Sequence, residues 1–419
     1  MTLKAEQEWT RLDNVAKIFP SKSDRKQTSV FRLYCELTEQ VDPLILQEAV
    51  DRAILEFPNF LYIMRQGVFW YYLEATSLHP SVSWEHKNVC GQIYDPQQKN
   101  LLFEVTYYKN RINLETYHVL SDGTGAFQFL KTILAFYFQK KYKVQVDIAQ
   151  LDPSVATQKS VDGFRKYYEP TRSHANFEMQ RVYHLKSKKR KNYMLVMEGI
   201  VSTKAVLAAA RRNHTTMTGF LAALFIDAIH QQMTLQDERK VIVLKVPVNL
   251  RTYFPSATTR NFFGMIDIVY DFKKCGSDLP SIIQEIDRQL HEKLTKEKLA
   301  ERMSTMSALE HNWFLRIVPL PLKNLVLSIV NRIHNAGETA VLSNVGRVDM
   351  PEEMKPYLRR FGTFTNTLGL QLTLCSFEDQ LQLGFTSYLV NRDVMRDFYR
   401  SLQKAGIDVE IRCNDFYAN

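Results

Sequence analysis

Hydrophobic and polar residues alternate along several short stretches in the first half of the chain, as in strands with one buried face. These stretches are 29–37, 60–64, 68–74, 102–108 and 112–118. The last two predict a hairpin that turns at Asn110-Arg111. Helical spacing of apolar residues appears at 43–57. It returns after Asp122, where Phe127, Leu130 and Ile133 begin a buried stripe.

The second half of the chain repeats this mixture of strands and helices. Strands are expected at 192–201, 241–248, 262–270, 341–348, 365–376 and 380–388, and helices at 203–212, 218–233, 277–312 (one or a pair) and 391–404. A long linker with two prolines, 150–173, precedes strands predicted near Phe177 and Tyr193. The pattern predicts an α/β (α+β) fold with two lobes, residues 1–170 and 171–419, and a boundary near residue 170.

The composition is that of an ordinary globular chain of 419 residues, 45% of them hydrophobic. No apolar run approaches the ~20 residues of a membrane span, and the polar N-terminus lacks the apolar core of a secretory signal. The cysteines are scattered and show no metal-binding spacing: Cys35, Cys90, Cys275, Cys375 and Cys413. We therefore expect a cytoplasmic protein with reduced thiols, no integral membrane segment and no metal site.

The net charge is +9, from 54 Lys and Arg against 45 Asp and Glu. Such a balance favours an anionic ligand, such as a nucleotide-linked thioester, or an acidic carrier protein, but it also occurs in plain soluble proteins. The dense basic run at 186–191 lies between strand-like segments and is interpreted as a solvated loop. No nucleic-acid-binding motif accompanies the charge, so no nucleic-acid partner is expected.

The candidate chemistry lies where a predicted strand meets the helix after it, at His118-x-x-x-Asp122-Gly123. Asp122 can cap that helix, and Gly123 keeps its start free of bulk. Imidazole titrates near neutral pH, which suits a general base. A buried structural histidine is the alternative, and the motif alone does not decide between them.

Two further stretches give the motif a context. They are Val246–Arg251, followed by Asn261–Gly264, and Leu342–Val348, followed by Pro351. Together with the histidine motif, these stretches resemble the three signatures of the superfamily that contains alcohol acetyltransferases, wax ester synthases, condensation domains and chloramphenicol acetyltransferase. The closest resemblance is to the alcohol acetyltransferases. Condensation domains and wax ester synthases usually carry two adjacent histidines, whereas Tyr117 stands before His118 here.

This resemblance implies a fold and site roles. It implies two chloramphenicol-acetyltransferase-like lobes, each a mixed sheet covered by helices, with an active-site channel between them. His118 would be the general base, and Asp122 would form an ion pair with Arg251 that points away from the substrate. Ser343 and Asn344 would lie near the reaction centre, as oxyanion donors or as turn residues.

Asn261, which follows Arg251 in the second signature, would shape a loop over the channel and is a further candidate to contact substrate. The resemblance favours an acyltransferase that moves an acetyl or short-chain acyl group from acyl-CoA to a small alcohol or amine. Such an enzyme is expected to be a monomer with no tightly bound cofactor. Two alternatives stay open. One is a condensation-type domain that takes its acyl group from an acyl carrier protein, and the other is a catalytically silent binding protein of the same fold.

Overall fold

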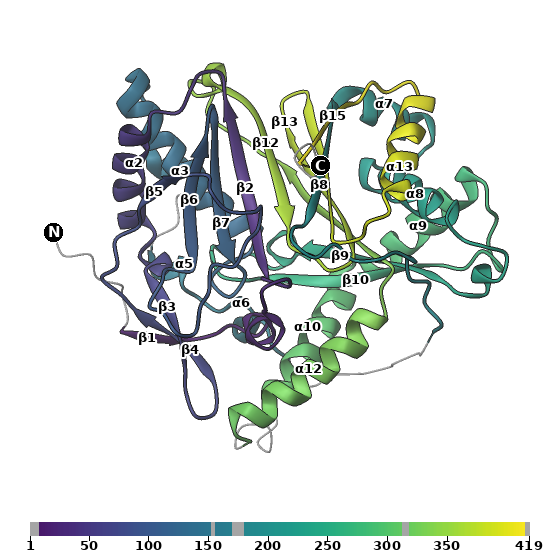
Figure 1. Ribbon diagram of the computed structural model, residues 1–419, viewed down its shortest axis with the longest axis horizontal. Coiled ribbons are helices and arrows are strands. Elements are labelled where there is room, and N and C mark those ends of the chain that lie inside the picture. The colour runs from purple at the N-terminus through teal and green to yellow at the C-terminus, as the bar shows by residue number, and fades with distance from the viewer. Residues whose placement is uncertain (1–7, 152–155, 170–179, 312–317, 415–419) are drawn as a thin grey trace.

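Two β-sheets lie side by side in the computed structural model, and helices cover their outer faces (Figure 1). The model describes residues 8–151, 156–169, 180–311 and 318–414. Strands and helices alternate in both halves of the chain, as the hydrophobic pattern predicts. The mixed α/β fold class is therefore confirmed.

The first sheet has five strands in the order β12-β2-β7-β6-β5. Their bounds are β12 Leu358–Thr365, β2 Val30–Leu37, β7 Arg111–Tyr117, β6 Phe103–Tyr108 and β5 Val82–Trp84. All neighbours are antiparallel except β5 and β6. Helices α2 (Pro43–Glu56) and α3 (Gly123–Tyr142) cover one face, and both begin where the sequence places them.

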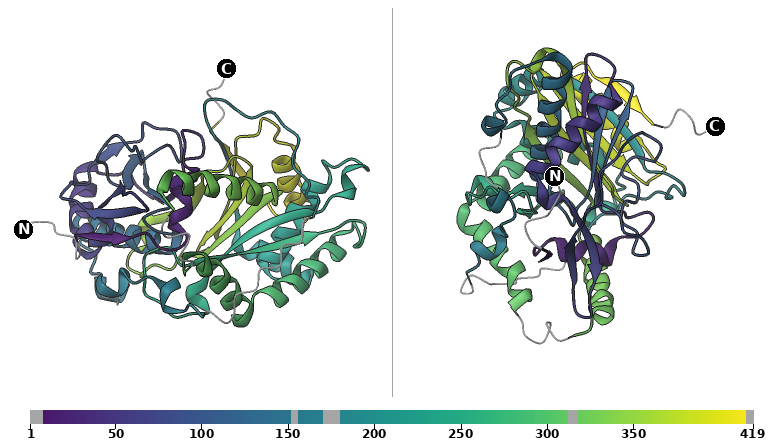
Figure 2. Two further views of the ribbon diagram at one scale, coloured as in Figure 1. Left: turned by 90° about the horizontal axis from the view of Figure 1, so that it is seen from below. Right: turned by 90° about the vertical axis from the view of Figure 1, so that its left-hand side faces the viewer.

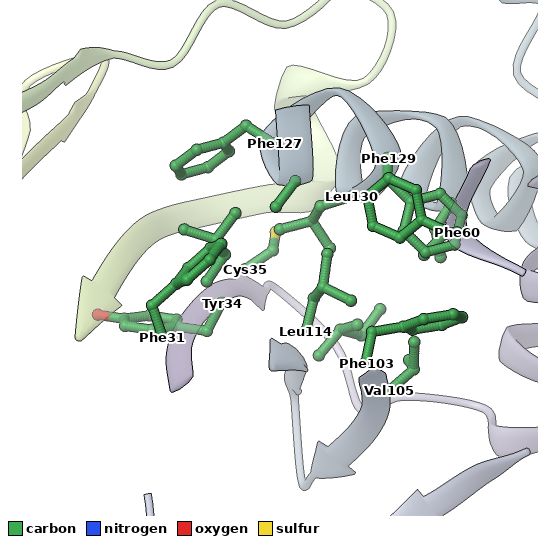
Figure 3. Packing of buried hydrophobic residues seen from close by; sticks show 14 of the residues in the cluster. Phe31, Tyr34, Cys35, Phe60, Phe103, Val105, Leu114, Phe127, Phe129 and Leu130 are labelled. Atoms are coloured by element: carbon green, nitrogen blue, oxygen red, sulfur yellow. The ribbon is translucent and has the colours of Figure 1, made fainter. Parts of the chain in front are cut away.

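An aromatic cluster fills the space between α3 and this sheet (Figure 3). The Phe129 ring lies 4.5 Å from that of Phe60 and 5.3 Å from that of Phe103, between ring centroids. Leu114 of β7 points at the same helix and is fully buried. The alternation along 112–118 therefore reflects a face that packs on α3.

The second sheet has seven strands in the order β10-β9-β11-β13-β14-β8-β15. Their bounds are β10 Phe263–Tyr270, β9 Ile242–Asn249, β11 Ala340–Arg347, β13 Leu370–Phe377, β14 Gln380–Ser387, β8 Leu195–Ser202 and β15 Glu410–Cys413. Its outer face is covered by α7 Thr203–Arg212, α8 Met217–His230, α9 Leu279–Lys293 and α13 Asp393–Lys404 (Figure 1). β11 is parallel to both β9 and β13, and the other pairings are antiparallel.

The smaller elements surround these two layers. They are the sheet β1-β4-β3 (Trp9–Arg11, Tyr71–Ala75, Tyr62–Gln66) and the helices α1 Phe19–Lys22, α4 Ile148–Leu151, α5 Ala156–Lys159, α6 Gly163–Lys166, α10 Lys296–His311 and α12 Leu320–Ala336. Figure 2 shows α12 lying beside the N-terminal half, where Leu320 donates its backbone N–H to the carbonyl oxygen of Val68. In the described parts of the chain, no helix has the length and hydropathy needed to cross a bilayer.

The halves of the chain interlock through β12. This strand comes from the C-terminal half but pairs with β2 in the N-terminal sheet, with Thr363 opposite Leu33. The Thr363 carbonyl oxygen then accepts a hydrogen bond of 2.7 Å from the Thr373 hydroxyl of the other sheet. The two sheets are therefore joined by β12, a strand of the C-terminal half of the chain that lies in the N-terminal sheet.

The boundary near residue 170 stays a prediction, because residues 170–179 lie outside the described residues. The strand predicted near Phe177 lies outside them for the same reason. The predicted helix at 277–312 is a pair, α9 and α10. β12, α12 and β15 were not expected. In β12 the buried Arg360, ion-paired with Glu36, interrupts the apolar alternation that would reveal a strand.

One predicted consequence concerns the two glycines at the start of α3. A Cβ added to Gly125 would lie 2.0 Å from the carbonyl oxygen of Thr259, whereas one added to Gly123 would meet nothing within 4 Å. Gly125→Ala should lower the free energy of unfolding by about 1–3 kcal/mol or more, as overpacking does. Gly123→Ala, the matched control, should change it by less than about 0.5 kcal/mol. Urea unfolding of both variants measures this, and equal stabilities would contradict the close approach.

Candidate active site

His118 lies immediately after β7, at the junction of the two halves of the chain. Its backbone N–H donates to Ser29 (2.9 Å) and so extends the pairing of β7 with the β2 side of the sheet. The imidazole is half-buried. Its ring centroid lies 4.9 Å from that of Phe19, 4.6 Å from Phe31 and 5.9 Å from Phe263. Three aromatic rings from separate segments therefore enclose the histidine, and one of them belongs to β10.

Tyr117, the residue that replaces the first histidine of a double-histidine motif, lies on the opposite side of the strand. It is fully buried, its hydroxyl is 3.0 Å from that of Ser23, and its ring stacks on that of Tyr94 at 5.7 Å. Burial raises the pKa of the Tyr117 hydroxyl well above its ordinary value. Tyr117 is thus part of the N-terminal core.

Asn261 reaches His118 from the C-terminal half. Its side-chain Nδ2 donates to the His118 carbonyl oxygen at 2.8 Å, and its Oδ1 lies 3.5 Å from His118 Nδ1. Asn261 is fully buried. The sequence predicted a loop residue over a channel. Asn261 lies in the loop before β10, and its amide is beside the imidazole.

Asp122 and Arg251, far apart in the sequence, form the predicted ion pair. The guanidinium nitrogens donate to Asp122 at 2.8 and 3.2 Å in a bidentate arrangement. Asp122 Oδ1 also caps α3 by accepting from the Gly125 N–H (3.0 Å), and Oδ2 accepts from the Phe262 N–H (2.8 Å). Four hydrogen bonds occupy the lone-pair positions of a carboxylate. Both oxygens of Asp122 are therefore held by donors from within the protein.

Arg251 in turn fixes the segment that carries Asn261. Its guanidinium donates to the carbonyl oxygens of Thr258 (2.9 Å) and Arg260 (2.6 Å). The hydroxyl of Ser121 donates to the carbonyl oxygen of Thr259 at 2.5 Å. The loop before β10 is thus tied to the start of α3 on both sides of the ion pair.

Ser343 lies on the same face of the seven-stranded sheet as Phe263, the β10 residue next to His118. Adjacent strand partners point their side chains to the same face, and alternate residues of a strand share a face. β9 pairs Asn249 with Phe263 and Lys245 with Val341. Ser343, two residues beyond Val341, therefore shares a face with Phe263, whose ring borders His118.

Asn344 points to the other face of the sheet. Its Nδ2 donates to the Thr218 hydroxyl of α8 at 2.9 Å, and its Oδ1 accepts from the Gly346 N–H at 2.8 Å. Gly346 has a φ of +89°, a conformation that favours glycine. These contacts correspond to the turn role that the sequence left open beside the oxyanion role.

Asp13 is a residue near the site that sequence reasoning did not find. It is 1% exposed, and its Oδ2 accepts from the side-chain Nδ2 of Asn261 at 3.0 Å. The segment around it has no strong period and no motif, so nothing in the sequence marked it. Among the described residues, no cluster of His, Cys, Asp and Glu has the arrangement of a metal site.

Comparisons with known proteins match this architecture. Residues 201–356 match the sequence profile of the family described as phthiocerol/phthiodiolone dimycocerosyl transferase C-terminus. That range contains Arg251, Asn261 and Ser343. A comparison with curated protein sequences found no significant match.

Three solved structures align over nearly the whole chain. The first is the TRI3 trichothecene 15-O-acetyltransferase from Fusarium sporotrichioides, with 10% identity, a TM-score of 0.62, and 95% of this chain and 94% of that one covered. The second is polyketide synthase associated protein 5 from Mycobacterium tuberculosis, with 14% identity, a TM-score of 0.61, and 94% and 96% covered. The third is the starter condensation domain of rhizomide synthetase in complex with C8-CoA, with 14% identity, a TM-score of 0.62, and 95% of each chain covered.

The chain therefore shares its fold with acetyltransferases and condensation domains. The resemblance predicted from three short signatures is thereby confirmed at the level of the fold. Asn261 contacts His118, and Arg251 contacts Asp122. The two pairs are linked through Phe262, which follows Asn261 and donates its backbone N–H to Asp122, and Ser343 shares a sheet face with Phe263.

The ion pair yields a stability prediction. The side chains of Asp122 and Arg251 are 6% and 10% exposed, and removing one partner of a buried pair costs about 3–5 kcal/mol. Asp122→Ala should lower the unfolding free energy by that order. Asp42→Ala, which removes the cap of α2, is the control and should cost about 0.5–2 kcal/mol. Chemical denaturation separates the two. Equal losses of unfolding free energy in the two variants would mean that Asp122 contributes no more than a helix cap does.

Asp13 yields a pH prediction. Burial raises its pKa to about 6, although Arg260 and the hydrogen bond from Asn261 lower it. Between pH ~4 and ~6 the folded protein holds a proton that the unfolded chain releases, so this group makes the fold less stable as pH rises. The wild type should gain about 2 kcal/mol relative to Asp13→Asn between pH 7 and pH 4, because each pKa unit corresponds to about 1.4 kcal/mol and part of the effect lies below pH 4. Urea titrations at each pH give this difference; a constant difference would contradict the raised pKa.

Proposed function

We propose that this protein transfers an acyl group from acyl-CoA to a small alcohol or amine, with His118 as the general base. The observation that carries the proposal is the placement of His118. It is half-buried at the junction of the two sheets, and residues from both halves of the chain contact it. A base at such a junction can meet two substrates that approach from different sides.

The reaction needs no covalent enzyme intermediate. His118 accepts the proton of the acceptor hydroxyl or amine as the nucleophile attacks the thioester carbonyl carbon. The tetrahedral intermediate then collapses, the C–S bond breaks, and the protonated imidazole returns the proton to the thiolate of CoA. The products are the ester or amide and free CoA, and the imidazole is neutral again.

The negative charge of the tetrahedral intermediate calls for a hydrogen-bond donor near the carbonyl oxygen. Ser343 is the candidate, because it lies on the same sheet face as Phe263, beside His118. Asp122 and Arg251 would hold the strand-to-helix turn, and Gly123 begins the helix. We assign them structural rather than chemical roles.

The donor distinguishes the leading function from its alternative. CoA and an acyl carrier protein both present an acyl thioester, and condensation domains are among the proteins with this fold. The net charge of +9 suits either anionic partner. We favour free acyl-CoA because Tyr117, in the core, replaces the first histidine of the condensation-type motif. All five cysteines are free thiols, which fits a reducing compartment such as the cytoplasm.

Mass spectrometry of purified protein tests the function directly. The protein is incubated with CoA thioesters of increasing acyl length and, separately, with the same acyl groups on a carrier protein. Each incubation includes a panel of alcohols and amines. Ester or amide formation from acyl-CoA supports the proposal, and product formed solely from the carrier-protein thioester favours the condensation alternative. No product from either donor favours the silent binding protein.

His118→Ala gives the mechanistic prediction. Loss of a general base should lower kcat by roughly 10²–10⁴-fold. Binding of the thioester should stay close to wild type, because imidazole is a small part of the surface that would contact CoA. The control is His79→Ala, which removes an exposed histidine that pairs with Asp51. Steady-state kinetics measures kcat, and calorimetric titration with a thioester measures the binding affinity. Wild-type turnover in His118→Ala would show that His118 is not the base.

A further inference from the structure

Asp13 contacts the site through Asn261. Its Oδ1 accepts from the Ala16 N–H at 2.8 Å, and its Oδ2 accepts from both the side-chain Nδ2 (3.0 Å) and the backbone N–H (3.3 Å) of Asn261. The guanidinium Nε of Arg260 is 3.9 Å from the same Oδ2. The carboxylate is thus buried against the residue that lies beside the imidazole.

These contacts determine which way the Asn261 amide faces. Its Nδ2 lies between the Asp13 carboxylate and the His118 carbonyl oxygen, at 3.0 and 2.8 Å. Both groups are pure acceptors when Asp13 is ionised, so the amide nitrogen must lie there. A reversed amide would place its oxygen against two other oxygens. The amide oxygen therefore faces His118 Nδ1.

The orientation of the amide favours one tautomer of the histidine, because the amide oxygen lies 3.5 Å from Nδ1. An amide oxygen only accepts, so it favours the neutral imidazole that carries its proton on Nδ1. The lone pair of that tautomer is on Nε2. In this tautomer, Nε2 is the nitrogen that can take the proton of the alcohol or amine substrate.

We propose that Asp13 is a positioning residue, which orients the Asn261 amide and through it keeps His118 in the tautomer that is basic at Nε2. This inference rests on the proposed function for its catalytic consequence, but the tautomer itself is a property of the resting protein. Asp122, the aspartate of the motif, cannot take this role. Its oxygens already accept from Gly125, Phe262 and Arg251.

Asp13 could instead serve solely to anchor the N-terminal segment, since it accepts from Ala16 and lies near Arg260. The two roles differ in one measurable respect. An anchor affects stability, whereas an orienting carboxylate also determines where the imidazole proton is. The position of that proton can be measured without any substrate.

Two-bond ¹H–¹⁵N NMR of protein with ¹⁵N-labelled histidine reports the tautomer. The His118 signal is assigned by its loss in His118→Gln. At a pH where the ring is neutral, we expect the Nδ1–H form in the wild type. In Asp13→Asn the side-chain amide can present N–H groups to Asn261, so the Nδ1–H share should fall. kcat should fall by about 10- to 100-fold, a part of the general-base contribution, with KM little changed.

Asp42→Asn is the control, because it changes a helix-capping aspartate to a residue that caps equally well. It should leave both the tautomer and kcat unchanged. Asn261→Ala gives a second test should Asp13→Asn fold poorly, and it should also lower the Nδ1–H share. Adding Asp13→Asn to Asn261→Ala should then change the tautomer no further, because the link is already broken.

An Nε2–H tautomer in the wild type would overturn the inference, as would an unchanged tautomer in folded Asp13→Asn. A further shift in the double variant would also contradict it, since Asp13 would then act by another path. If the tautomer responds as expected but no thioester is turned over, the positioning role holds and the proposed acyl transfer fails.

Discussion

The Asp122 carboxylate is the constraint on which the rest of the site depends. It caps α3 from the N-terminal half and accepts from Arg251 and the Phe262 backbone of the C-terminal half. A buried carboxylate needs compensation by donors, and here those donors come from both halves of the chain. The ion pair can therefore form only when the halves are in register. The four-residue spacing from His118 to Asp122 follows from this geometry, because it spans the turn from the end of β7 to the start of α3.

Close backbone packing reinforces the same junction. Gly125 allows the Thr259 carbonyl oxygen to approach the first turn of α3, and the Ser121 hydroxyl donates to that oxygen. Arg251 holds the carbonyl oxygens on either side of Thr259. The segment that leads into β10 is thus tied down over several consecutive residues. Asn261 and Phe263 contact His118 because this segment has little freedom to place them elsewhere.

The sequence predicted well those features that depend on local pattern or on short signatures. Alternation at 112–118 and helical spacing after Asp122 located β7, α3 and the histidine between them, and the signatures anticipated the pair of Asp122 with Arg251. Features that depend on tertiary partners could not be predicted from the sequence. Arg360 looks like a surface residue until Glu36 of the facing strand is known. Asp13 lies in a segment without periodicity, and it gains meaning only from Asn261, 248 residues away.

Asp122 and Asp13 show how differently the same side chain can be buried at one junction. Asp122 has a guanidinium at hydrogen-bonding distance, so its charge is matched directly. Asp13 has its nearest cation at 3.9 Å and relies mainly on N–H groups, and burial accordingly raises its pKa to about 6. Near neutral pH an ionised Asp13 therefore makes the fold less stable. A buried charge that costs stability needs a reason beyond folding, and the orientation of the Asn261 amide supplies one. The two carboxylates therefore have different roles at the junction. Asp122 joins the start of α3 to the segment before β10, and Asp13 orients the Asn261 amide that lies beside His118.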